Sequence, residues 1–193
     1  LRIINDDIVE AGGGFSTHEH HDIEIFNYVI EGELEHRDSL GNVSVIQAGN
    51  LQYISAGTGI EHSESNPSTT ARLHFLQMWL APNVDGGTPR YAEKKLGMQA
   101  PKNALTRLFA GKSRAGAVEI RQDAEIFFGK CDKGRTLSVQ ISLGRHAWLQ
   151  IIKGQIRVQD ETLAEGDVAA VSNAAGVEIY ANQDSHFLFF NLA

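Results

Sequence analysis

Short apolar or alternating runs, separated by Gly, Asn, Asp and Ser, dominate the chain, and segments with a helical period are scarce. The clearest predicted strands are 23–30, 41–49, 73–80, 117–122, 148–159 and 186–192. Ser39-Leu40-Gly41, between two polar strands, predicts a hairpin loop that ends in glycine. Many short strands at close spacing are typical of an all-β barrel or sandwich and not of βαβ units.

The pattern occurs twice along the chain. Two pairs of segments correspond, namely 28–38 with 149–160 and 47–57 with 164–176. Gly32 then aligns with Gly154, and Gly49 aligns with Gly166. Because the offset is near half the chain, the repeat predicts two β domains in tandem.

A stretch rich in proline and glycine lies between the two repeats. Three of the four prolines fall between positions 82 and 101, and a Gly-Gly pair lies among them. We therefore expect residues 85–101 to form a linker. The predicted domains are residues 1–84 and residues 102–193.

Composition limits the classes of partner. The chain has 193 residues and a formal net charge of -7, and no run of Lys and Arg exceeds two residues. Such a chain offers no electrostatic reason to bind nucleic acid or an anionic membrane directly. No apolar stretch approaches the roughly 20 residues that span a bilayer, and no signal peptide is visible.

The single cysteine, Cys131, excludes an internal disulfide and fits a cytoplasmic location. The chain begins without Met, in what already looks like a strand (LRIIN), so we expect the natural start to lie upstream.

Two short segments carry the chemistry. In THEHHDIE (17–24), His18, His20, Asp22 and Glu24 occupy even positions, and alternate side chains of a strand share one face. In TGIEHSESN (58–66), His62 and Glu64 are likewise two apart. A small barrel can bring the two pairs face to face.

Three imidazoles and one carboxylate suit a divalent first-row transition metal and leave two octahedral positions open for substrate and dioxygen. A lone His-x-His pair is more often a surface accident, but two His/carboxylate pairs, each after a glycine-rich turn, favour a metal site. Spacing alone does not decide whether Glu64 or Glu24 supplies the carboxylate.

The other histidines carry less weight. His21 points away from its neighbours and is expected to be solvated. We expect His36 at a solvated strand end and His74 in the core, and His146 and His186 have no partner at ligand spacing.

At these residues the chain resembles the cupin superfamily, and within it the pirin family. The first cupin motif runs from Gly12 through His18-x-His20 and Glu24 to Gly32, and the second from Gly49 through Gly57 and His62 to Asn66. LRIINDDIVEAGGGFSTHEHHDIEI and SAGTGIEHSESNPS look like the pirin-type pattern, in which the second motif contains His-x-Glu. The resemblance covers essentially the whole chain, although pirin-like chains carry roughly forty more residues before LRIIN.

The resemblance implies an all-β bicupin, with two jelly-roll barrels in tandem. It also implies the metal ligands His18, His20, His62 and Glu64, and leaves Glu24 as a carboxylate of the cavity. Counting from Gly154 places Gln140, Ser142 and His146 at the positions of the first ligands, so the second barrel is expected to lack metal.

The activity that the resemblance implies is quercetin 2,3-dioxygenase-like. An Fe(II)-type enzyme would cleave a flavonol with O2 and release carbon monoxide, with Glu64 or Glu24 as general base. Fe(II) is favoured, and Cu, Mn, Ni, Co and Zn stay possible. Candidates to line an apolar cavity are Phe15, Phe26, Tyr28, Tyr53 and Trp79.

Two other functions are consistent with the same residues. One is a non-catalytic, metal-dependent regulator that binds a protein partner. The other is a cupin isomerase or small-ligand binder that uses the ion only to position its ligand.

Overall fold

The computed structural model describes residues 1–96 and 100–193. The chain divides into two compact units, residues 1–98 and residues 99–193. Every regular element among the described residues is a β-strand, and none of these residues forms a helix with the length and apolar character needed to cross a membrane. The all-β fold expected from the sequence is therefore confirmed.

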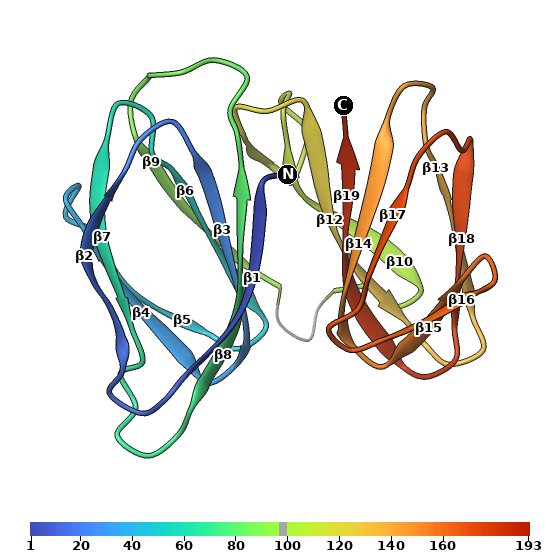
Figure 1. The fold of residues 1–193 in the computed structure, drawn as a ribbon, viewed down its shortest axis with the longest axis horizontal. Coiled ribbons are helices and arrows are strands. Elements are labelled where there is room, and N and C mark those ends of the chain that lie inside the picture. The colour runs from blue at the N-terminus through green and yellow to red at the C-terminus, as the bar shows by residue number, and fades with distance from the viewer. Residues whose placement is uncertain (97–99) are drawn as a thin grey trace. The chain divides into compact units, whose positions relative to one another are not determined.

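The first unit contains two sheets. Sheet A has the strand order β1-β8-β3-β6-β9, and sheet B has the order β2-β7-β4-β5. In Figure 1, β2 and β7 lie across the barrel from β3 and β8. The strands are β1 (Ile3–Val9), β2 (Gly14–His20), β3 (Glu24–Glu31), β4 (Glu33–Asp38), β5 (Val43–Gln47), β6 (Asn50–Ser55), β7 (Ile60–Ser65), β8 (Leu73–Leu80) and β9 (Arg90–Lys95).

The second unit repeats this design. Sheet C has the order β11-β10-β12-β19-β14-β17, and sheet D has the order β13-β18-β15-β16. The strands are β10 (Ala104–Ala110), β11 (Val118–Glu119), β12 (Ala124–Cys131), β13 (Thr136–Gln140), β14 (His146–Lys153), β15 (Gln155–Val158), β16 (Glu161–Ala164), β17 (Val168–Val171), β18 (Gly176–Ala181) and β19 (Ser185–Leu192).

The two units share one jelly-roll topology. Strands β1-β8-β3-β6 of sheet A correspond in order to β12-β19-β14-β17 of sheet C, and β2-β7-β4-β5 correspond to β13-β18-β15-β16. The segments 28–38 and 149–160 that the sequence pairs cover corresponding successive strands, β3 and β4 in the first unit and β14 and β15 in the second. The predicted duplication is thus present in the strand order.

The stretch predicted as a linker, 85–101, contains a strand. Strand β9 pairs with β6 and forms an edge of sheet A. Its side chains are mostly charged, as is common on edge strands, which resist pairing with other chains; the sequence therefore looks like a loop. Residues 97–99 lie outside the described residues, and the proposed domain limits at 84 and 101 stay predictions.

The two interiors differ in chemistry. In the second unit the core is apolar and includes Phe187 and Phe189. In the first unit, Ile25, Asn27 and Val29 of β3 share one face of the strand. Ile25 belongs to one apolar cluster and Val29 to another. Asn27 lies between them and belongs to a set of buried polar residues that also includes His36, Gln52, His62, Glu64 and Gln77. A polar band therefore crosses this interior.

Each unit has a glycine at the same tight crossing. Gly32, between β3 and β4, has φ of 79°, and a Cβ there would lie 2.5 Å from the carbonyl oxygen of Arg72. Gly154, between β14 and β15, has φ of 86°, and its Cβ would lie 2.3 Å from the carbonyl oxygen of Asp184. The repeat preserves glycine here because both the left-handed conformation and the close backbone require it.

Gly32→Ala is expected to lower the free energy of unfolding by about 3 kcal/mol, since a left-handed alanine costs about 1–2 kcal/mol and its Cβ meets backbone. Gly49 is a matched control, because its φ is 82° and a Cβ there would meet nothing within 4 Å. Gly49→Ala should cost only about 1 kcal/mol. Urea unfolding measures both variants, and equal losses would contradict the steric argument.

Candidate metal centre

The register of sheet B brings the histidine motifs together. Strands β2 and β7 place His18 directly opposite His62, after a bulge between Phe15 and His18. Strands β4 and β7 place His36 opposite Glu64. Because alternate residues of a strand share a face, His62 and Glu64 both point into the barrel, where they are 1% and 0% exposed.

His18, His20 and His62 form a compact cluster. Their ring centroids are 4.8 Å (18 to 20), 4.5 Å (18 to 62) and 4.9 Å (20 to 62) apart. One nitrogen of each ring can be chosen so that all three lie within 4.8 Å of one another. The structure therefore brings together all three histidines that the sequence predicts as ligands.

The ring nitrogens of this cluster fit a cation. The Nε2 atoms of His18 and His62 face each other at 3.0 Å. The Nδ1 atom of His18 lies 2.8 Å from the carbonyl oxygen of Ser16, to which it donates when protonated, so that Nε2 keeps its lone pair. Nε2 of His20 is buried and has no hydrogen-bond partner within residues 1–96 and 100–193. Converging nitrogen lone pairs are what a divalent transition metal needs.

The surroundings keep two of these rings, those of His20 and His62, neutral. Burial, and then the neighbouring His18, lower the pKa of His20 to about 4. Burial, and then the imidazoles of His18, His20 and His36, lower the pKa of His62 to about 3. Imidazole binds a metal in its neutral form, so the site is electrostatically prepared for a cation.

Glu64 lies beside this cluster in a cradle of amides. One carboxylate oxygen accepts a hydrogen bond from Asn27, and the other accepts one from Gln77 at 2.7 Å. Its Oε1 lies 3.9 Å from Nδ1 of His62, and Glu64 groups with His36 and His62 rather than with His18 and His20. Burial raises the pKa of Glu64 to about 7, against the opposing effect of the two amides.

Glu24 does not lie where the sequence places it. Strand β2 ends at His20, Asp22 has φ of 49°, and β3 begins at Glu24, so the alternation is interrupted. The Glu24 carboxylate accepts hydrogen bonds from Tyr53 and Ser55, both at 2.5 Å. Asn27 faces Glu64 across the barrel. Glu24 is three residues before Asn27 on β3, so its side chain lies on the opposite face of the strand and points away from sheet B.

His36 is a residue of the site that sequence reasoning missed. It was expected at a solvated strand end, but its side chain is 0% exposed. Its Nε2 lies 2.9 Å from Oδ2 of Asp38, and its ring stacks on Tyr91 at 5.1 Å. The period-2 pattern Leu34, His36, Asp38 was the available signal, since Leu34 is a core residue of the same face.

Most of the aromatic residues proposed for the cavity lie elsewhere. Trp79 on β8 contacts the His20 ring edge-on at 5.0 Å and is the one that reaches the described cluster. Phe26 and Tyr53 pack together at 5.2 Å beside Glu24, on the other face of sheet A. Phe15 lies opposite Glu64 across β2 and β7 and is 43% exposed.

Comparison with known proteins identifies the family. Residues 2–80 match the family model described as Pirin, and residues 108–192 match the one described as quercetinase C-terminal cupin domain. Quercetin 2,3-dioxygenase of Escherichia coli strain K12 is 40% identical over 192 residues, which span 100% of this chain and 82% of that protein. The chain belongs to the pirin family.

Solved pirin structures agree with this assignment. The crystal structure of YhhW from Escherichia coli has a TM-score of 0.96 and 39% identity, over 100% of this chain and 81% of that one. The same bacterial pirin in complex with nickel(II) has a TM-score of 0.94 and 40% identity, over 100% and 82% of the two chains. The bicupin fold inferred from the sequence is confirmed.

The remaining histidines of this pirin lie outside the cluster. His21 is exposed and lies 2.8 Å from Glu19. His74 is paired with Asp6. His146 lies 2.7 Å from the hydroxyl of Ser172 and is exposed. The two groups of potential metal ligands found among the described residues both belong to the first unit. The absence of metal from the second cupin stays a prediction.

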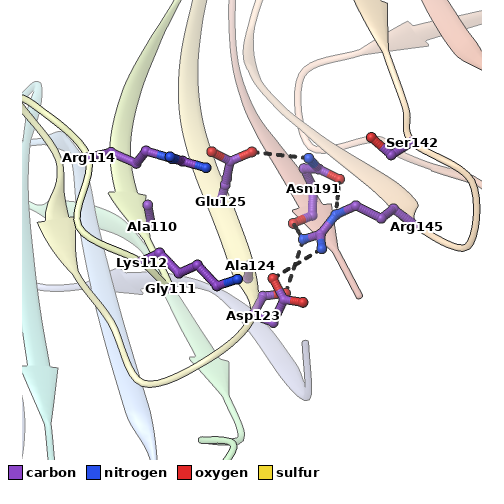
Figure 2. A pocket seen from close by; sticks show the side chains of 10 residues that line it. All are labelled: Ala110, Gly111, Lys112, Arg114, Asp123, Ala124, Glu125, Ser142, Arg145 and Asn191. Atoms are coloured by element: carbon purple, nitrogen blue, oxygen red, sulfur yellow. Dashed lines mark hydrogen bonds and ion pairs between the residues drawn. The ribbon is translucent and has the colours of Figure 1, made fainter.

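A hollow of about 270 Å³ in the second unit has different chemistry (Figure 2). Arg145 donates to Asp123 at 3.1 Å and to Asn191 at 2.8 Å, and Arg107 pairs with Glu125 at 2.9 Å. The residues that line it include neither histidine nor cysteine. Its acids are held by arginines of the same barrel, so this hollow does not compete with the imidazole cluster as a metal site.

Gln77→Met removes a donor to Glu64 at similar volume. We expect a loss of about 2 kcal/mol in the free energy of unfolding, because a buried carboxylate oxygen loses its partner. In a double-mutant cycle, Gln77→Met should cost less in a Glu64→Met background, where the Nε1–H of Trp79 loses its acceptor but no carboxylate loses a donor. Chemical denaturation of metal-free protein measures the cycle, and equal costs in both backgrounds would show that the amide does not act on Glu64.

Proposed function

We propose that this pirin is a metal-dependent dioxygenase that cleaves a flavonol such as quercetin with O2. The observation that carries the proposal is the convergence of the imidazoles of His18, His20 and His62 in the first cupin, two of which, His20 and His62, have lowered pKa values. The 40% identity to the quercetin 2,3-dioxygenase of Escherichia coli supports the reaction, and the nickel(II) complex of a bacterial pirin supports the metal.

The proposed ligands are His18, His20, His62 and Glu64. The three rings supply nitrogen donors, and Glu64 supplies negative charge as the fourth ligand. A divalent first-row ion held there would act as a Lewis acid and lower the pKa of a bound hydroxyl. Fe(II) is the ion we favour, and nickel(II) is the ion that a relative contains.

Other residues of the site would contact the substrate or orient the Glu64 carboxylate. Trp79 forms an apolar wall beside His20 and would pack against an aromatic substrate. Asn27 and Gln77 hold the Glu64 carboxylate in one orientation through its two oxygens. We assign the role of general base to Glu64 rather than to Glu24, because Glu24 faces away from the cluster.

His62→Ala tests the metal and the reaction together. Purified protein reloaded with Fe(II), Ni(II), Cu(II) or Mn(II) is assayed for metal content and for oxygen uptake with quercetin. We expect metal content far below one ion per chain and a loss of uptake of at least about 100-fold, because removal of a ligand exceeds the effect of an outer-shell change. His21→Ala, one residue beyond the cluster and exposed, should match the wild type.

Two outcomes would refute this function. Absence of turnover with every one of these ions would remove the dioxygenase. Undiminished metal in a folded His62→Ala variant, with folding checked by circular dichroism, would remove the proposed ligand set.

A further inference from the structure

One ring nitrogen of the proposed ligand His62 is left without a hydrogen-bond partner in the described structure. Its Nε2 faces His18, so an ion bound by this cluster would take Nε2 and leave the proton on Nδ1. That Nδ1 is buried and has no partner among the described residues. A histidine that binds a metal through one ring nitrogen nearly always donates the N–H of the other to an acceptor. A buried N–H without an acceptor lowers the stability of the protein by about 1–3 kcal/mol.

Glu64 is poorly placed to be this acceptor. Its Oε1 is 3.9 Å from Nδ1 of His62, beyond hydrogen-bond distance. Both of its oxygens already accept from amides, one from Asn27 and one from Gln77. As a proposed metal ligand, Glu64 would also give a carboxylate lone pair to the ion.

His36 offers an unused acceptor on the same side. Its Nε2 lies 2.9 Å from Asp38, whose oxygens also accept from Asn42 and from the backbone of Leu40. A carboxylate so surrounded accepts only, so Nε2 of His36 carries the proton and Nδ1 keeps its lone pair. Nδ1 of His36 is buried, and the described part of the chain offers it no hydrogen-bond partner.

The register keeps these groups adjacent. His36 lies opposite Glu64 and Asp38 opposite His62 across β4 and β7, so His36 and His62 are diagonal neighbours. Their ring centroids are 5.5 Å apart, and ligand atoms of His36, His62 and Glu64 lie within 4.8 Å of one another. Stacking on Tyr91 at an interplanar angle of 26° holds the His36 ring.

We propose that His36 is a positioning residue that accepts the Nδ1–H of His62, with Asp38 fixing the tautomer of His36. The inference rests on the proposed function, since it assumes that His62 binds the ion through Nε2. The chain Asp38–His36–His62 orients the ligand ring and raises its basicity, as carboxylate–histidine pairs do at other metal centres.

Two substitutions at His36 separate hydrogen bonding from packing. His36→Asn places an acceptor oxygen near the position of Nδ1, whereas His36→Gln reaches only the position of Nε2. Metal-free, full-length protein is titrated with Ni(II), and the visible spectrum is recorded after loading with Co(II). We expect His36→Gln to raise the Kd about 10–100-fold and to shift the Co(II) bands, and His36→Asn to stay within about 3-fold of the wild type.

Two further variants complete the design. Asp38→Asn should weaken Ni(II) binding in the same direction as His36→Gln, because the amide no longer dictates the tautomer of His36. This variant also serves if His36→Gln does not fold. His74→Gln is the matched control, because His74 pairs with Asp6 outside the cluster, and it should leave the Kd unchanged.

The possible results are distinct. Wild-type affinity and spectrum in both His36→Gln and Asp38→Asn would overturn the inference, and so would equal weakening in His36→Asn and His36→Gln. Uptake of two ions by the wild type and one by His36→Gln would show that His36 is itself a ligand. If the wild type binds none of Ni(II), Co(II) and Fe(II), the proposed function fails as well, whereas normal binding with an unaffected His36→Gln removes only the role of His36.

Discussion

The strand register of sheet B is the constraint on which the rest of the site depends. Pairing of β2 with β7 sets His18 opposite His62, and pairing of β4 with β7 sets His36 opposite Glu64. A slip of one residue would turn every side chain of β7 to the other face of the sheet. Ile60, which shares the inward face with His62 and is 1% exposed, would then meet solvent, so the apolar residues of β7 help to fix the register that positions the polar ones.

The two cupins show how one topology carries two interiors. Corresponding strands occupy corresponding places in both units, and Gly32 and Gly154 mark the same crossing. In the second barrel the inward positions carry apolar side chains such as Ile151 and Phe187. In the first, amides and imidazoles occupy part of that space, and they are tolerated because amides such as Asn27 hydrogen-bond the buried carboxylate. Among the described residues, the groups of potential metal ligands lie in the first unit.

Much of this could be predicted from the sequence because the signals are local. Two-residue spacing within THEH and HSE determines which side chains share a face, and the duplication determines the architecture. Two features could not be predicted in the same way. The positive φ of Asp22 interrupts the strand alternation and turns Glu24 away from the face that His18 and His20 share. No residue pattern in the sequence predicts this interruption. The burial of His36 depends on Tyr91, which comes from a strand that looked like a linker.

Crystals of the protein grown with nickel(II) would test the central claim most directly, through an anomalous difference map recorded at the nickel absorption edge. The account predicts one strong peak in the first cupin, bonded to ring nitrogens of His18, His20 and His62. A map with that cluster empty while nickel is bound at other side chains would contradict the account.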